Sequence, residues 1–206
     1  MPRVIVFDFG GTLDTHGRHW GDVLFTRWQT ALPGLSHDVF WEAYVAAERA
    51  MTTEEDWDFR RTLRHKCRLE ARFMQRPDAP EQADAVADAC YELARECTSR
   101  SKNVLETLRA KGMPLVLVSN FYGNLPAVLR DFGLEDCFDH VVESARVGVR
   151  KPDSAIFRLV LDLYPALTPA DVLVAGDSER NDILPAQSLG MKTHLVRKFE
   201  DLLALV

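Results

Sequence analysis

The chain has 206 residues, of which 47% are hydrophobic and 27% are charged, and its formal net charge is -6. This length suits one well-packed core with an insertion, and the composition is that of a globular protein rather than a disordered or fibrous one. The acidic balance provides no positive field for a nucleic-acid backbone or an anionic membrane surface, so neither is expected as a partner.

The first apolar run, Val4 to Phe7, ends after four residues at Asp8. It is too short for a signal peptide or a membrane span, which predicts a cytoplasmic protein. Its length and its valine and isoleucine content predict a buried β-strand.

The next stretch, residues 15–98, contains no β-rich run and reads as amphipathic helices, notably over 38–50, 56–74 and 83–97. It also carries all four tryptophans: Trp20, Trp28, Trp41 and Trp57. Aromatic residues at such spacing either stack on a substrate or, more commonly, fill the core of a helical bundle. We therefore expect an all-helical cap over residues 15–98, inserted into a core domain formed by 1–14 and 99–206.

From residue 99 onward, short apolar runs alternate with helical patterns. Strands are predicted over 115–118, 140–142, 172–175 and 193–196, and helices over 103–110, 125–132, 154–163 and 183–189. This alternation requires right-handed βαβ crossovers. The predicted fold class is therefore α/β: a Rossmann-like open parallel sheet with helices on both faces, plus the inserted cap.

The four cysteines are scattered through segments that read as helix: Cys67, Cys90, Cys97 and Cys137. No CxxC spacing occurs among them, which argues against a zinc site or a disulfide framework. Buried free thiols are expected.

Polar side chains follow the predicted strands, where ligands of open parallel sheets bind. Asp8 precedes Gly10, Gly11 and Thr12, and glycines let backbone N–H groups approach an anion closely. The same letters also fit an ordinary turn.

Later strand ends carry further candidates. Ser119 and Asn120 suit phosphate oxygens or, equally, a helix N-cap. Lys151 is either a site cation or a solvated surface charge. Asp177 and Asp182 span a strand end and a helix start, where two carboxylates can face one hard cation.

In their order along the chain these residues resemble the haloacid dehalogenase-like (HAD) hydrolase superfamily. Asp8 with Gly11 and Thr12 is similar to the first of its four motifs, Ser119 to the second, Lys151 to the third, and the segment 176–182 to the fourth. The insertion occupies the place of that family's C1-type cap.

The resemblance implies a phosphatase that uses Mg²⁺, held by Asp8, the Gly10 carbonyl and Asp177, with Asp182 assisting. Asp8 would act as the nucleophile on a small phosphorylated metabolite and form an aspartyl-phosphate, which splits one hard displacement into two easier ones. The resemblance also assigns phosphate binding and charge stabilisation to a set of neighbours: Gly11, Thr12, Ser119, Asn120 and Lys151.

One position departs from the family pattern, because Gly10 stands where most of its phosphatases carry a second, acid/base aspartate. Loss of a general acid typically costs about 10²- to 10⁴-fold in rate. A slow phosphatase with another proton source is one hypothesis; Asp14, His16 and His19 are the nearest candidates, unless they are solvated loop side chains. The substitution disfavours a phosphosugar mutase.

Two alternatives remain open. In the first, the chain is a binding or regulatory protein that has lost most turnover. In the second, it is a 2-haloacid dehalogenase, an enzyme whose relatives also lack the second aspartate. The acidic pair Asp177 and Asp182 argues against the dehalogenase, because a metal-free displacement has no use for it.

The cap also carries a basic run: Arg60, Arg61, Arg64, His65, Lys66, Arg68 and Arg72. It either clamps a second anionic group of the substrate or forms a solvated helix face. The sequence names no substrate, and we expect a monomer or a weak homodimer.

Overall fold

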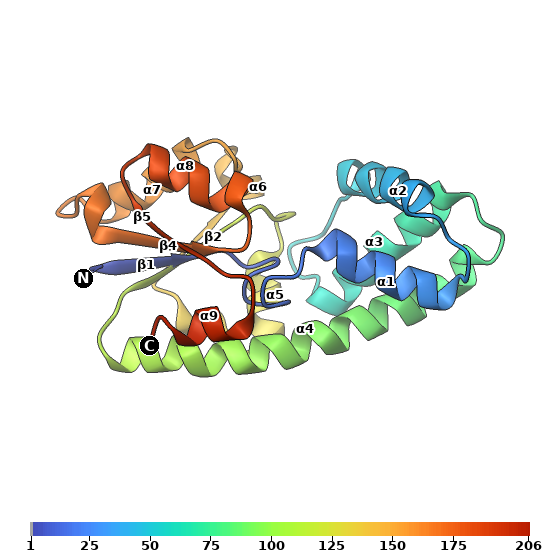
Figure 1. The fold of residues 1–206 in the computed structure, drawn as a ribbon, viewed down its shortest axis with the longest axis horizontal. Coiled ribbons are helices and arrows are strands. Elements are labelled where there is room, and N and C mark those ends of the chain that lie inside the picture. Colours follow the sequence, from blue (N-terminus) through green and yellow to red (C-terminus); the bar gives the residue numbers. More distant parts are fainter. Residues whose placement is uncertain (1) are drawn as a thin grey trace.

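The computed structural model describes residues 2–206 and places a helical lobe beside an α/β core (Figure 1). The core sheet contains five strands: β1 (Val4–Phe7), β2 (Leu115–Ser119), β3 (His140–Glu143), β4 (Val172–Gly176) and β5 (Lys192–Leu195). All neighbouring pairs are parallel, in the order β3-β2-β1-β4-β5. The predicted open parallel sheet is confirmed.

Alternate residues of β1 pack against opposite faces of the sheet, because successive side chains of a strand point to opposite sides. Ile5 and Phe7 share one hydrophobic cluster with the helices on one face, and Val4 and Val6 share another cluster on the other face. The first face is covered by the C-terminal half of α4 (Ala79–Ala110), α5 (Leu125–Asp131) and α9 (Phe199–Leu203). The second is covered by α7 (Ala155–Leu163) and α8 (Leu184–Ser188). Four short elements complete the core: 3-10 turns η1 (Glu135–Cys137) and η2 (Pro169–Asp171), α6 (Ser144–Val147) and the π-helical turn η3 (Glu179–Ile183).

The helical lobe consists of α1 (Trp20–Ala31), α2 (His37–Ala50), α3 (Phe59–Met74) and the N-terminal half of α4. The sequence had not singled out α1, which contains Gly21 and begins after an unusual N-cap. The His19 ring accepts the Gly21 N–H at 3.0 Å, so it replaces the Ser or Asp that normally marks a helix start. α3 begins three residues later than predicted, because Asp58 caps it by accepting the Arg61 N–H at 2.7 Å.

The two helices expected over 83–97 and 103–110 are one continuous helix, α4, so that expectation was wrong. The polar stretch between them does not break the helix, because its hydroxyls find partners. Thr98 donates to the Ala94 carbonyl at 2.8 Å, and Ser101 donates to the Leu13 carbonyl, also at 2.8 Å. The predicted boundary between residues 98 and 99 therefore falls inside a helix that runs along both lobes (Figure 1).

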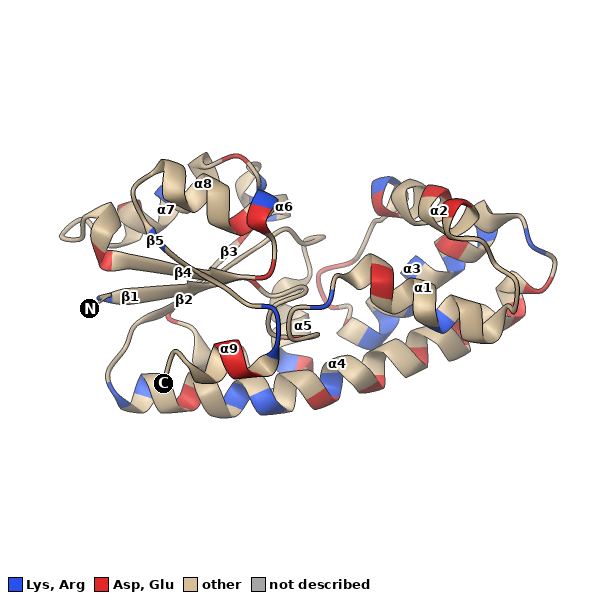
Figure 2. Cartoon of the chain, in the orientation of Figure 1, with Lys and Arg blue, Asp and Glu red and all other residues tan. Residues whose placement is uncertain are grey.

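The basic run of the cap is largely paired within the lobe. Arg60 and Arg64 contact Asp88 on α4, and Arg68 contacts Asp84. Figure 2 shows acidic and basic residues interspersed along α3 and α4. The arginines therefore join two helices instead of forming a free cationic patch.

Several smaller expectations can be compared with the structure. All four cysteines are buried and free, as predicted. Trp28 is fully buried and donates its Nε1–H to Glu70 at 2.7 Å, whereas Trp41 remains 37% exposed. Within residues 2–206, no helix combines the length and the apolar character that a membrane crossing needs.

Candidate active site

The site is centred on Asp8, which follows β1 and is buried beside Lys151. The Lys151 ammonium lies 2.5 Å from Asp8 Oδ1 and 2.7 Å from Asp182 Oδ1, so one cation joins two carboxylates. Burial alone would lower the pKa of Lys151, but the two carboxylates more than compensate and raise it. Lys151 is 4% exposed, so the solvated surface charge considered from the sequence is ruled out.

Asp177 approaches from the loop after β4, on the other side of Asp8. The Thr12 hydroxyl lies 3.2 Å from both Asp8 Oδ2 and Asp177 Oδ1, and it accepts the Asp177 N–H at 3.0 Å. A Cβ at Gly11 would lie 2.4 Å from the Asp177 carboxylate, and Gly11 has a φ of 96°. Gly11 is therefore needed for the close approach of Asp177. Its N–H is already donated to Asp14 at 2.7 Å, which leaves no backbone donor there for a phosphate.

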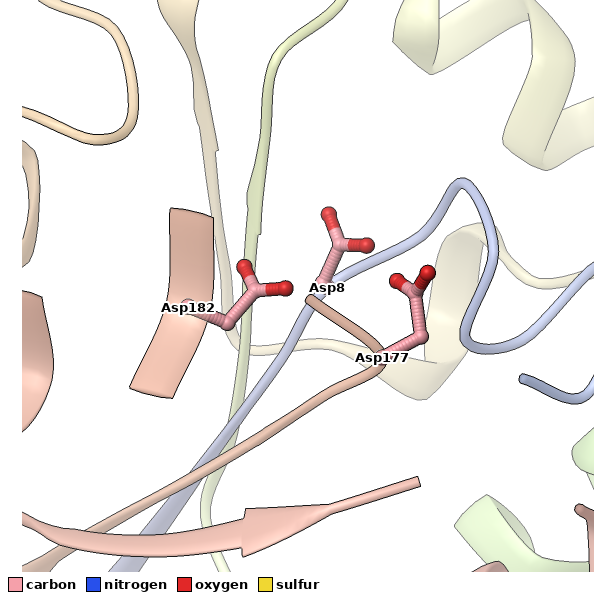
Figure 3. A group of neighbouring side chains, drawn as sticks. All are labelled: Asp8, Asp177 and Asp182. Atoms are coloured by element: carbon pink, nitrogen blue, oxygen red, sulfur yellow. The ribbon is translucent and has the colours of Figure 1, made fainter. Parts of the chain in front are cut away.

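The three aspartates gather at the carboxyl ends of β1 and β4 (Figure 3). One oxygen of each lies within 4.8 Å of one oxygen of the other two. Burial raises the pKa of Asp177 to about 6, with a further contribution from Asp182, and burial also raises the pKa of Asp182 to about 6. With Lys151 as the only adjacent cation among the described residues, three ionised carboxylates leave two uncompensated negative charges.

Ser119 and Asn120 end β2 but have different surroundings. Ser119 is buried, and the register of β1 against β2 puts it at the same edge of the sheet as Asp8. Asn120 exchanges two hydrogen bonds of 2.9 Å with the backbone of Lys151. The Asn120 amide therefore positions Lys151 and is not directed at a phosphate.

Comparison with known proteins agrees with this geometry. Residues 2–190 match the family model described as haloacid dehalogenase-like hydrolase. The chain belongs to the haloacid dehalogenase-like hydrolase family.

Individual HAD proteins match different shares of this chain. The haloacid dehalogenase-like hydrolase domain-containing protein 3 of Mus musculus is 35% identical over 61% of this chain, which spans about half of that protein (51%). The ribulose-1,5-bisphosphate 5-phosphatase of Halopiger xanaduensis is 29% identical over 98% of this chain and 87% of its own length. Among solved structures, the HAD-hydrolase YfnB of Bacillus subtilis, bound to magnesium, shares the fold with a TM-score of 0.59 at 20% identity, covering 99% of this chain and 98% of its own.

The donor set of this HAD chain fits a hard divalent cation such as Mg²⁺. Carboxylate and carbonyl oxygens are the ligands that Mg²⁺ prefers, and a charge of +2 would balance the excess negative charge of the aspartates. Asp8 and Asp177 are the better ligand candidates, because Asp8 Oδ2 and Asp177 Oδ1 share a single Thr12 hydroxyl at 3.2 Å. Both Asp182 oxygens have donors of their own: Lys151 at Oδ1 and the Ser178 N–H, at 3.1 Å, at Oδ2. Within residues 2–206, no N–H or O–H group donates to the Gly10 carbonyl, which keeps it available as a third ligand.

The three candidate proton donors differ in their surroundings, and they are not all solvated loop side chains. Asp14 is fully buried; its carboxylate accepts the Gly11 N–H and the Trp20 Nε1–H at 2.8 Å, and burial raises its pKa to about 8. His16 is buried against Ser101, and burial, reinforced by Arg100, lowers its pKa to about 4. Only His19 lines the cavity described next, and it also caps α1.

A cavity of about 760 Å³ is lined by Gly10, two residues after Asp8, and by Asn120 and Arg150, the chain neighbours of Ser119 and Lys151. Residues of the helical lobe line it as well, among them Tyr44, Glu48 and Lys66, and Tyr122 contributes from the core loop after β2. The sequence had indicated Lys66 only as part of the basic run, and it had not indicated the other three. A helical-wheel argument would have found Lys66. It lies two positions from both Arg64 and Arg68, so it points away from the face that pairs with α4.

Proposed function

We propose that this HAD hydrolase is a magnesium-dependent phosphatase that acts on a small phosphorylated metabolite through an aspartyl-phosphate on Asp8. One observation carries the proposal. Asp8 is buried between a lysine ammonium 2.5 Å away and two further carboxylates whose charges are not balanced. This arrangement suits a carboxylate nucleophile that meets an anionic substrate at a cation.

The roles of the residues follow from their contacts. Asp8 Oδ2 would attack phosphorus while Oδ1 stays paired with Lys151, whose charge also stabilises the transferring phosphoryl group. Thr12 orients both Asp8 and Asp177, and Asp182 and Asn120 position Lys151 from two sides. The Ser119 hydroxyl would donate to a phosphoryl oxygen. Bound Mg²⁺ would supply charge neutralisation for the attack of one anion on another.

The leaving group receives no proton from residue 10, because Gly10 has no side chain. Asp14 is not a substitute, since its carboxylate is fully buried and already accepts two hydrogen bonds. We therefore propose slow turnover of alkyl phosphates and faster turnover of esters whose leaving groups need little protonation. Water in the cavity would supply the remaining protons.

The acidic cluster favours this function over metal-free haloacid hydrolysis. A displacement at carbon by Asp8 needs no cation, and three carboxylates within 4.8 Å would then be an electrostatic cost without a purpose.

The test is phosphate release from p-nitrophenyl phosphate with Mg²⁺ and with EDTA, alongside chloride release from chloroacetate. We expect hydrolysis of the phosphoester that EDTA abolishes and no dehalogenation. Chloride release that persists in EDTA would establish the dehalogenase instead. A wild-type protein inert with every phosphoester, but active as Gly10→Asp, would indicate a binding protein that has lost turnover.

A further inference from the structure

The cavity has a polar patch formed by Lys66 and Glu48 of the helical lobe and by Tyr122 of the core loop after β2. Lys66 on α3 forms an ion pair with Glu48 on α2, and its ammonium lies 4.5 Å from the centre of the Tyr44 ring. The Tyr122 hydroxyl of the core donates to Glu48, with oxygen distances of 2.9 and 3.1 Å. The same cavity is lined by Gly10, two residues after Asp8, so the leaving part of a substrate held at Asp8 would extend toward these residues.

The Lys66–Glu48 pair is ionised and carries no net charge. Burial raises the pKa of Glu48, but the Lys66 ammonium more than offsets this and leaves that pKa below its ordinary value. Lys66 is 5% exposed and stays protonated, since neighbouring tyrosine and carboxylate groups raise its pKa against the effect of burial. A buried ion pair without net charge attracts neither an anion nor a cation strongly.

Hydrogen-bonding capacity is left over on both members of the pair. A lysine ammonium has three N–H donors, and Glu48 accepts one of those of Lys66. The Glu48 side chain is 32% exposed and its carboxylate has about four acceptor sites. Adjacent free donors and acceptors match hydroxyl groups, each of which donates and accepts at once.

The remaining wall is mostly apolar and aromatic, with Trp20, Phe59 and Phe121 beside Tyr44 and Tyr122. Aromatic faces pack against the C–H bonds of a carbon skeleton whose hydroxyls point to the polar patch. Two arginines, Arg49 and Arg150, also line the cavity but are exposed, so water and salt screen their charges.

We propose that Lys66, Glu48 and Tyr122 form a subsite for the hydroxyl groups of the substrate, so that the preferred substrate is the phosphomonoester of a sugar or another polyol. This inference rests on the proposed phosphatase function. It makes Lys66 a specificity-determining residue, acting on the leaving part of the substrate and not on the phosphoryl group.

The first test compares kcat/KM for ribose 5-phosphate with that for butyl phosphate, 3-phosphoglycerate and fructose 1,6-bisphosphate. A site that hydrogen-bonds hydroxyls rejects analogues without them, so we expect ribose 5-phosphate to exceed butyl phosphate by at least about tenfold. A higher value for the carboxylate or the bisphosphate than for ribose 5-phosphate would overturn the proposal, because it would indicate a second anion site.

The second test uses Lys66→Met and the milder Tyr122→Phe, which keeps the ring. Each is expected to lower kcat/KM for ribose 5-phosphate, Lys66→Met by about tenfold or more. The loss for p-nitrophenyl phosphate, whose nitrophenyl group carries no hydroxyl, should be smaller, so the ratio of the two kcat/KM values should fall. Arg64→Met is the matched control, because Arg64 lies on the same helix but pairs with Asp88. Equal losses with both substrates would contradict a role in hydroxyl recognition.

A binding measurement separates failure of this inference from failure of the proposed function. Ribose 5-phosphate should raise the melting temperature of the wild type, and Lys66→Met should reduce that rise while butyl phosphate has no effect in either. This pattern would support the subsite even in a protein without turnover. Hydrolysis of p-nitrophenyl phosphate without any such pattern would refute the subsite and leave the phosphatase function standing.

Discussion

Two buried lysines differ in how their charges are balanced. Lys151 in the core lies among Asp8, Asp177 and Asp182, which leaves an excess of negative charge. Lys66 in the cap is matched one to one by Glu48. The first cluster carries net negative charge that protons or a cation would balance, whereas the Lys66–Glu48 pair carries no net charge.

This difference suggests that the two lobes have different functions. An unbalanced acidic cluster at strand ends, held by a rigid sheet, suits the binding of a metal and the attack on phosphorus. A balanced pair on helices suits the recognition of uncharged polar groups.

The largest effect is expected for Lys151→Met. Loss of the ammonium removes the charge that faces Asp8 and the transferring phosphoryl group, and we expect kcat for p-nitrophenyl phosphate to fall by roughly 10²- to 10³-fold. Steady-state assays at saturating Mg²⁺ measure this. If Lys151→Met and Lys66→Met reduced kcat for this substrate by the same factor, the proposed division between the lobes would be wrong.

Gly10→Asp should produce a gain. A Cβ at residue 10 would meet only the Trp20 ring, at 3.7 Å or more, which is ordinary van der Waals contact. The new carboxyl group would protonate the leaving group, so hydrolysis of butyl phosphate should rise by about 10²-fold. The rate with p-nitrophenyl phosphate, whose leaving group needs little protonation, should change much less. An unchanged ratio between the two substrates would show that residue 10 does not limit the rate.

Asp14→Asn should have a small effect, below about tenfold on kcat/KM. The asparagine oxygen can still accept the Gly11 N–H, and only the contact with Trp20 is lost. The pH profile of kcat/KM should keep its shape. A loss of 10²-fold or more together with loss of one limb of that profile would identify Asp14 as the missing acid.

The smallest effect is expected for the pH dependence of folding stability in the absence of metal. Asp177 and Asp182 have folded-state pKa values of about 6, above their ordinary value of 3.8, so the folded state binds more protons than the unfolded one between about pH 4 and 6. Stability in EDTA should therefore decrease as the pH rises through this window. Added Mg²⁺ should restore it above pH 6.

Asp177→Asn tests the same point at pH 7. Removing one of the repelling carboxylates should raise the metal-free melting temperature by roughly 2–4 °C, the equivalent of about 1 kcal/mol in a chain of this size. Mg²⁺ should then have little further effect on melting. A variant that Mg²⁺ stabilises as strongly as the wild type would exclude Asp177 as a ligand.

The core was predictable because its signals are local. A buried parallel strand is a short apolar run, and the polar residue that ends it lies at the ligand-binding edge. Asp8 and Asp177 could therefore be placed together although they are more than a hundred positions apart, and Lys151 was added to them by its resemblance to the third family motif. The detailed contacts of the site could not be predicted from local sequence. Gly11 is required by the approach of Asp177, and Asn120 hydrogen-bonds to the Lys151 backbone.

The helical lobe was less predictable, since its helices depend on an unusual N-cap residue and on a contact with a distant segment. α1 depends on the His19 N-cap, and the continuity of α4 depends on Ser101 reaching Leu13 in another segment. Lys66 was hidden in a run of like charges. Its role emerges only when the arginines on the opposite face are seen to pair with α4.

The most direct test of the account is to trap the covalent intermediate. The enzyme is acid-quenched during turnover of p-nitrophenyl phosphate with Mg²⁺, treated with borohydride, and mapped by peptide mass spectrometry. Reduction of an aspartyl-phosphate gives homoserine, and we predict this conversion at residue 8 alone and only when substrate and Mg²⁺ are both present. Continued phosphate release with Asp8 unmodified would contradict nucleophilic attack by Asp8.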